Sequence, residues 1–329
     1  MKRKIIKQGH NTLTITLPSE WVKKLNLSSG GEIDVCERDN GLFLSTEKNN
    51  LHRKKEVDLD DMDIPTVWKY FMACYREGYD EIVVNFKPDK RFDNPYKFIT
   101  QHHLDSRYIK DKNQQTVLEF IHGVVNRFIG FEIVDHGKNY VIIKDMGEPS
   151  SREFDNALRR IFLLLQEMIE ETCNGLREED PQILAHIPDV DINLDKFHDY
   201  CIRILNKIGN KDSRKTHILF TTLYLLELMG DEFKNISTHL IRDFSKSEFK
   251  NIFEIADSIK EQIDLFYSLF YQYDLKKVMK ISEIDQKRYA NVTKVFKKTT
   301  KEEDEIFHHL RIVTRYINAL TELRIEMEF

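Results

Sequence analysis

Residues 225–236 read LLELMGDEFKNI, and this stretch decides how the second half of the chain is interpreted. Its apolar residues recur at helical spacing, while Glu227 and Asp231 lie four positions apart and so share one helix face. Two carboxylates at this spacing repel each other unless a cation or another partner lies between them. Gly230 costs about 1 kcal/mol in a helix interior relative to alanine, which suggests a close approach at this point.

A second acidic row lies in residues 189–205, DVDINLDKFHDYCIRIL, where Asp191, Asp195 and Asp199 are again four positions apart. Helix-dipole preference accounts for acids in the first turn, but Asp195 and Asp199 are too far along for that explanation. If the two helices are antiparallel neighbours, Asp195 and Asp199 can face Glu227 and Asp231. Such an oxygen-rich group suits a divalent or iron-type metal ion, while a solvated acidic face stays open as the alternative.

The chain from residue 150 onward is predicted to be nearly all helix, because glycine and proline are scarce (12 and 7 in 329 residues) and apolar periodicity persists. Six helices joined by short connections indicate antiparallel packing, as two three-helix bundles or one long one. The expected bounds are 152–176, 190–208, 213–242, 246–272, 275–299 and 302–328.

These features together resemble the PhoU family of phosphate-uptake regulators. The residues that match its L-E-R-I-G-D-x-x-x-N-I-A signature are Leu226, Glu227, Gly230, Asp231, Asn235 and Ile236. The resemblance implies a six-helix pair of three-helix bundles with metal bound at Asp195, Asp199, Glu227 and Asp231. The second bundle departs from the family pattern, with Tyr289 and Thr293 where the acids of the first bundle stand. One metal site is therefore expected rather than two.

The first 50 residues have a different pattern, made of short β-branched runs separated by turns. KIIKQ and TLTITL flank Gly9-His10-Asn11, a short helix follows Pro18 with Ser19 as its expected N-cap, and two further strands surround Asp39-Asn40-Gly41. A unit this small buries too little apolar surface to be stable alone, so dimerisation is expected.

This segment resembles the AbrB/SpoVT/MazE swapped-hairpin domain. The residues that carry the resemblance are Gly9, Leu13, Thr14, Ile15, Thr16, Leu17, Pro18, Trp21, Val22, Leu25, Leu27, Gly31, Ile33 and Val35. The resemblance implies an intertwined homodimer that binds DNA.

Charge is distributed unevenly along the chain. Residues 1–54 hold ten Lys and Arg against six Asp and Glu, a net charge of +4, whereas the whole chain carries −5. A basic head on an acidic body favours a polyanionic partner for the head. The predicted DNA-contacting residues are Lys2, Arg3, Lys4, Lys7 and His10, and a solvated basic edge that merely discourages strand pairing is the alternative.

The chain is thus predicted to be multidomain and mainly α, with three parts. These are a swapped-hairpin β-domain (1–50), a small α+β middle segment (56–148) and a PhoU-like helical domain (150–329). In the middle segment, helices are expected over IPTVWKYFMACYREGYD and QTVLEFIHGVVNRFIGF, and strands over EIVVNF and on both sides of His136-Gly137.

Composition excludes several protein classes. No stretch approaches the roughly 18 apolar residues of a membrane span, and the basic start lacks the apolar region of a signal peptide. The four cysteines are scattered without zinc spacing. A cytoplasmic protein is expected.

The function that these patterns favour is a phosphate-responsive, non-enzymatic regulator that binds DNA, a metal ion and a second copy of itself. Two alternatives stay open. One is an adaptor that docks a phosphate transporter ATPase or a sensor kinase and uses the head only to dimerise. The other is a metal-dependent phosphohydrolase, for which His198 and His239 are the only nearby histidines.

Overall fold

The computed structural model describes residues 2–9, 11–38, 41–45, 52–93, 114–147, 150–209, 212–243, 249, 252–296 and 299–329. The chain divides into two compact units, Met1–Leu51 and His52–Phe329. The first unit corresponds to the predicted β-domain. The second combines the α+β segment with the helical body.

The first unit consists of two antiparallel strand pairs and a short helix. Its elements are β1 (Ile6–Gln8), β2 (Thr12–Thr14), α1 (Ser19–Lys24), β3 (Asp34–Arg38) and β4 (Gly41–Ser45). The N-cap of α1 is Pro18 and no side chain caps the helix, so the expectation that Ser19 is the cap is wrong. Ser19 is already the first helical residue, one position too far along to act as a cap.

Apolar side chains of the first unit are left open to solvent. None of its residues for which exposure is described is buried. Leu13 is 68% exposed, Ile5 67%, Leu42 65% and Val35 56%. A single copy of the unit therefore lacks a hydrophobic core of its own in the described residues.

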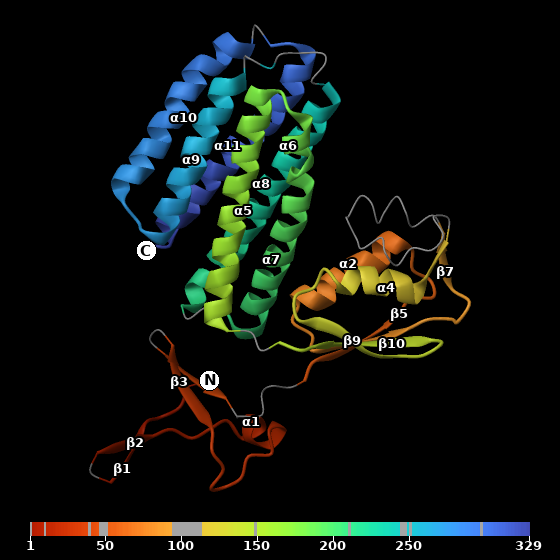
Figure 1. Cartoon of the computed structure of the whole chain (residues 1–329). Helices are drawn as coiled ribbons and strands as arrows, with labels where there is room; N and C mark the ends of the chain where they lie inside the picture. The colour runs from red at the N-terminus through yellow and green to blue at the C-terminus, as the bar shows by residue number, and fades with distance from the viewer. Residues whose placement is uncertain are drawn as a thin grey trace. The chain divides into compact units, whose positions relative to one another are not determined.

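The α+β segment is a four-stranded sheet with two helices on one face (Figure 1). The sheet order is β5-β6-β10-β9, with β5 (Lys54–Asp58) parallel to β6 (Glu81–Asn85), and β10 (Tyr140–Asp145) antiparallel to both β6 and β9 (Phe131–His136). The helices are α2 (Ile64–Arg76) and α4 (Val117–Val125). Alternate residues of β6 and β10 are buried in a core with both helices, as expected for a sheet covered on one side. β7 (Arg91–Asp93) and β8 (Gln114–Thr116) form a separate pair.

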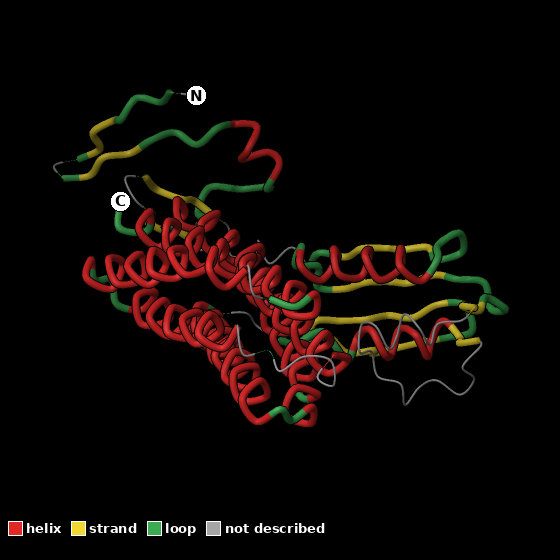
Figure 2. The backbone as a smooth tube through the Cα atoms, turned by 90° about the horizontal axis from the view of Figure 1, so that it is seen from above, coloured by secondary structure: helices red, strands yellow, loops and turns green. Residues whose placement is uncertain are grey.

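The helical body has a single apolar core that runs through all of its long helices. The helices are α5 (Ser151–Glu178), α7 (Ile187–Ile208), α8 (Thr216–Asp243), α9 (Phe253–Tyr271), α10 (Leu275–Phe296) and α11 (Lys301–Glu326), with a short α6 (Pro181–Ala185). Helices α5, α7 and α8 pack on one another, α9 packs on both α10 and α11, and α8–α11 and α5–α9 contacts join the two groups. Figure 2 shows the long helices running alongside one another.

The structure confirms a mainly helical chain with a small β-domain at its N-terminus. The helix α6, which begins at Pro181 behind an Asp180 cap, was not expected from sequence. Predicted helix 246–272 begins at Phe253 among the described residues, and part of the difference (246–248 and 250–251) lies outside them. The specific PhoU arrangement of two bundles stays a prediction. Within the described residues, no helix combines the length and the apolar character that a membrane span requires.

Candidate functional site on helix α7

Five charged side chains follow one another at every fourth position of α7. They are Asp191, Asp195, Asp199, Arg203 and Lys207, here called the α7 stripe. Residues four apart lie on the same helix face, so the stripe extends about 24 Å at roughly 1.5 Å per residue. Its first three residues form an acid half and its last two a basic half.

The acid half is paired with arginines of the α+β segment. Arg76, the last residue of α2, places its Nη2 2.6 Å from Oδ1 of Asp199. Arg127, which follows α4, places its Nη2 2.9 Å from Oδ2 of Asp195, and its guanidinium lies 5.3 Å from the ring centroid of Trp68. Two of the four predicted metal ligands therefore already have a cationic partner.

Helix α8 supplies a third cation to the acid half. Nζ of Lys234 lies 2.7 Å from Oδ2 of Asp191 and also contacts Asp231. Asp191 is buried, and its second oxygen has no hydrogen-bond partner among the described residues. Gly230 explains how α8 comes so close to α7, since a Cβ there would lie 3.0 Å from Leu194 and 3.3 Å from Asp191. The close approach expected at this glycine is confirmed.

Glu227 completes this group, here called the carboxylate cluster: Asp191, Asp195, Asp199, Glu227 and Asp231. Glu227 has no ion pair among the described residues. Burial, followed by the charges of Asp195 and Asp231, raises the pKa of Glu227 to about 8. Among the described residues, three cationic side chains form ion pairs with the five carboxylates: Arg76, Arg127 and Lys234.

His198 is buried beside Asp199 of the cluster. Nδ1 of His198 is 3.2 Å from a carboxylate oxygen of Asp199, and both side chains are at most 2% exposed. Burial opposes the ionisation of Asp199, but the contact with His198 and the charge of Arg76 hold the pKa of Asp199 below its usual value. Nε2 of His198 has no hydrogen-bond partner in the described residues.

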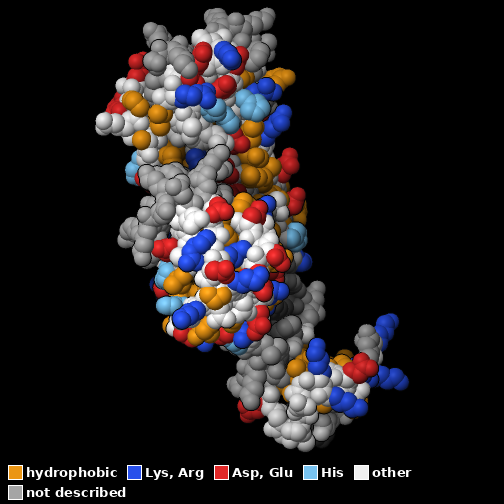
Figure 3. Space-filling view, turned by 90° about the vertical axis from the view of Figure 1, so that its right-hand side faces the viewer, with side chains coloured by type: hydrophobic (Ala, Val, Ile, Leu, Met, Phe, Trp, Pro, Cys, Tyr) orange, Lys and Arg blue, Asp and Glu red, His pale blue; other side chains and the backbone are white. Residues whose placement is uncertain are grey.

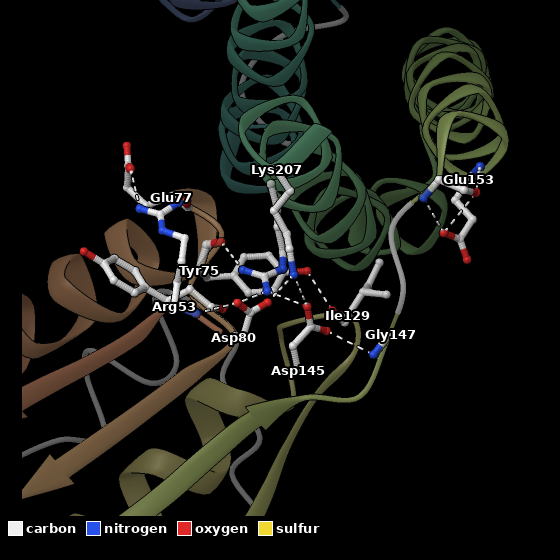
Figure 4. A network of polar contacts seen from close by, with 12 residues as sticks. Arg53, Tyr75, Glu77, Asp80, Ile129, Asp145, Gly147, Glu153 and Lys207 are labelled. Carbon is white, nitrogen blue, oxygen red and sulfur yellow. Dashed lines mark hydrogen bonds and ion pairs between the residues drawn. The ribbon is translucent and has the colours of Figure 1, made fainter. Parts of the chain in front are cut away.

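The basic half of the stripe binds the other end of the α+β segment (Figure 4). Arg203 donates hydrogen bonds to the backbone carbonyls of Tyr75 and Tyr79, at 2.7 and 2.8 Å, and to Asp145 at 2.5 Å. Its guanidinium lies between two aromatic rings, 5.0 Å from the centroid of Tyr75 and 4.7 Å from that of Phe131. Arg203 is 1% exposed, so it is a fully enclosed contact.

Lys207 adds two further ion pairs at this end. Its Nζ lies 2.5 Å from Asp80 and 2.9 Å from Asp145. A Cβ on Gly78 would meet the Lys207 side chain at 2.5 Å, and Gly78 also has a positive φ of 83°. Glycine is thus required where α2 ends, both for the turn and for the close approach of α7.

The predicted metal residues lie together, but most have cationic partners. Asp195, Asp199 and Asp231 are ion-paired, and Glu227 is not. The donor set consists of oxygens alone, the ligand type of a hard divalent cation. However, no three of the five carboxylates bring ligand atoms within 4.8 Å of one another in the described residues, so as they lie here they do not fit a metal ion.

Within the part of the chain that the structure describes, two groups of three side chains elsewhere in the helical body do bring potential metal-ligand atoms within 4.8 Å of one another. They are Glu167, Glu171 and His186, and His239, Asp243 and Glu305, and neither includes a predicted ligand. In the second group Nη2 of Arg242 lies 2.6 Å from both Asp243 and Glu305.

Sequence reasoning found the acids of this site and missed its cations. Arg203 and Lys207 continue the same four-residue spacing as the acids, so the periodicity of α7 alone carried that signal. Arg76 and Arg127 come from another part of the chain, and no local pattern relates them to α7.

The predicted DNA-contacting residues lie on the first unit. Lys2, Arg3, Lys4 and Lys7 are all exposed, and Lys7 belongs to β1. His10 lies outside the described residues, as do Asp39 and Asn40 of the predicted turn. In Figure 3, basic side chains project from the small unit at the lower right.

A comparison with known families supports the identity of this unit. The model described as antidote-toxin recognition MazE, bacterial antitoxin, matches residues 6–52. The first unit is therefore a MazE/AbrB-like domain, as its residue pattern predicted. No curated protein matches the chain.

Proposed function

We propose that the chain is a dimeric, DNA-binding transcription regulator whose helical body binds a metal ion and reports phosphate status. The observation that carries the DNA-binding part is the coreless, basic first unit, which matches the MazE model over residues 6–52. A second copy would cover Leu13, Val35 and Leu42 and so supply the missing core. Dimerisation doubles the basic side chains available for phosphate contacts.

Salt-dependent DNA binding tests this part. Fluorescence anisotropy with duplex DNA between 50 and 300 mM KCl should give a steep linear fall of log K with log salt, at about 0.9 per phosphate contact. The variant K4Q/K7Q removes up to four contacts per dimer and should reduce the slope by up to about 3.6. K69Q/K138Q, which alters two exposed lysines of the second unit, is the matched control and should leave the slope unchanged. Salt-independent or absent DNA binding would instead favour the adaptor.

The metal part of the proposal concerns Asp195, Asp199, Glu227 and Asp231. This part rests on the PhoU resemblance, and a divalent cation would require these carboxylates to come closer together than they lie here. Glu227 and Asp231 would hold it, since the first has no counter-ion and the second shares Lys234 with Asp191. Metal content and Mg²⁺ or Mn²⁺ titration of wild type beside E227Q/D231N test the site, and equal binding by both would refute it.

Phosphate responsiveness rests on the PhoU resemblance of residues 226–236 and adds the expectation of a transporter ATPase or sensor kinase partner. We infer a non-enzymatic role, since regulation of this kind needs only binding. Phosphatase turnover with Mn²⁺ or Mg²⁺ would favour the phosphohydrolase instead. The family description also favours a second candidate, in which the head recognises a protein toxin. Co-purification of a small protein with the isolated wild-type chain, lost in L13S, would support that role.

A further inference from the structure

Two faces of helix α5 differ in how their glutamates are paired. Glu170 has a cationic partner, since Nζ of Lys260 on α9 lies 3.1 Å from its carboxylate. Glu167 and Glu171 lie four positions apart and share another face of the helix. The carboxylates of these two residues make no hydrogen bond or ion pair with any residue that the structure describes. This face therefore holds two neighbouring acids without a described counter-ion.

His186 joins these two glutamates. Each of the three side chains offers a ligand atom, and the three atoms all lie within 4.8 Å of one another. Around a tetrahedral ion with metal–ligand bonds of about 2.1 Å, ligand atoms lie about 3.4 Å apart, so these three need to close by at most about 1.4 Å. Glu167 and Glu171 are half-buried and His186 is exposed, so solvent reaches the group.

One oxygen of Glu171 is enclosed without a hydrogen bond. Its Oε2 is almost inaccessible to solvent and has no hydrogen-bond partner in the described part of the chain. Burial raises the pKa of Glu171, an effect that His186 opposes and the charge of Glu167 increases. An enclosed carboxylate oxygen costs free energy unless a hydrogen bond or a bound cation satisfies it. This oxygen, independently of the spacing of the acids, points to a ligand at this place.

Gly175 brings the histidine beside the glutamates. It continues the row of Glu167 and Glu171 by four positions, and a Cβ there would lie 2.6 Å from Leu184 of α6. The glycine therefore allows α6 to pack closely on α5. His186 follows α6 directly and precedes the first residue of α7, and backbone hydrogen bonds to both sides hold it at this junction. The position of its imidazole is thus set by packed helices.

We propose that Glu167, Glu171 and His186 form a binding site for one divalent transition-metal ion such as Zn²⁺. Two carboxylate oxygens and one imidazole nitrogen suit ions of borderline softness, whereas Mg²⁺ and Ca²⁺ prefer oxygen ligands alone. Three protein ligands leave a further position for water. The bound ion ties α5 to the junction of α6 and α7. The site shares no residue with the carboxylate cluster and goes beyond the function proposed above.

Calorimetric titration of the untagged, full-length protein tests the site. Protein stripped with EDTA and dialysed is titrated with Zn²⁺ or Mg²⁺ chloride, each alone, at equal ionic strength. Wild type should bind Zn²⁺, and E171Q/H186N should lose one equivalent of this binding or bind it about 100-fold or more weakly. Loss of even an outer partner of a metal ligand costs about 10–100-fold in affinity, so loss of two ligands costs at least the upper value.

A matched control alters the same residue types elsewhere. E178Q/H217N changes an exposed glutamate of α5 and an exposed histidine of α8, and it should bind Zn²⁺ as wild type does. H186N alone changes an exposed side chain, so it should fold normally and still lose the binding. Equal amide exchange in α8 of metal-free wild type and variants checks that each variant is folded.

Amide exchange by mass spectrometry also locates the ion. At a free Zn²⁺ concentration about ten times Kd, exchange in α6 of wild type should slow about tenfold, since the ion binds only when the junction is closed. The same Zn²⁺ concentration should leave exchange in α6 of E171Q/H186N unchanged.

Three outcomes would overturn the inference. The first is equal Zn²⁺ binding by wild type and E171Q/H186N. The second is equal slowing of exchange in α6 by Mg²⁺, which would identify a general acidic patch. E227Q/D231N separates this site from the carboxylate cluster, since it should keep both the Zn²⁺ equivalent and the slowed exchange in α6. The third is loss of both in E227Q/D231N, which would assign the ion to the cluster instead.

Discussion

The carboxylate cluster makes a quantitative prediction about pH and stability through Glu227. Burial and the charges of Asp195 and Asp231 raise the pKa of Glu227 from 4.5 to about 8. At about 1.4 kcal/mol per unit, this shift corresponds to an upper bound of about 5 kcal/mol between the two protonation states. Since Glu227 is partly open to solvent, about 2–3 kcal/mol is a fairer expectation.

The sign follows from the raised pKa. The folded protein favours the protonated carboxyl, so the contribution of Glu227 to stability is complete below about pH 4.5 and is lost as pH rises towards 8. Glu227→Gln keeps the shape of the neutral side chain without its titration. In EDTA, the variant should match wild type near pH 5 and exceed its free energy of unfolding by about 2–3 kcal/mol near pH 9.

Urea unfolding at pH 5 to 9 measures this difference. It is followed by the emission of Trp68 in a W21F background, which removes the other of the two tryptophans of the chain. The control E322Q alters an exposed glutamate of α11 and should follow wild type at every pH. Parallel curves for wild type and E227Q would refute the reasoning, because Glu227 would then ionise in the folded protein as it does in the unfolded one. Saturating Mg²⁺ should reduce the difference in free energy of unfolding between E227Q and wild type at pH 9 if the cation neutralises the ionised Glu227 of wild type.

Three further predictions concern single contacts. Arg203→Met should lower the free energy of unfolding by about 3–5 kcal/mol, since it leaves Asp145 with one counter-ion fewer, and urea unfolding checks this; a loss below about 1 kcal/mol would show that this enclosed ion pair contributes little to stability. Gly230→Val should cost about 1–3 kcal/mol through overpacking against Leu194, whereas Gly230→Ala should be much milder, a contrast that thermal unfolding can measure. Leu13→Ser should weaken dimerisation in sedimentation experiments, and an unchanged dimer would argue against the head as the interface.

Local sequence patterns predicted most elements of the fold. The apolar periodicity of residues 151–326 indicated the long helices, because a helix buries one face at a fixed spacing wherever it packs. The boundaries were less certain where a breaker such as Pro181 opens a short extra helix rather than a loop. For the small β-domain, the spacing of turns and strands was enough to predict the type of domain, and the family comparison over residues 6–52 agrees.

The carboxylate cluster shows where local patterns stop. Spacing placed Asp195 with Asp199 and Glu227 with Asp231, since residues four apart on a helix share a face whatever surrounds them. Gly230 likewise predicted that another element packs closely against this helix, although the sequence did not show that Leu194 and Asp191 of α7 are the residues it meets.

The sequence by itself thus determined the helices, the acidic rows and the small basic β-domain at the N-terminus. Only the tertiary structure decided what faces those rows. Arg76 lies 123 residues from Asp199 and Arg127 lies 68 from Asp195, and the packing of the α+β segment on α7 brings each pair into contact. A carboxylate row has the same sequence whether a solvent cation or a distant arginine neutralises it, because the spacing of acids on one helix contains no information about the charge across the interface.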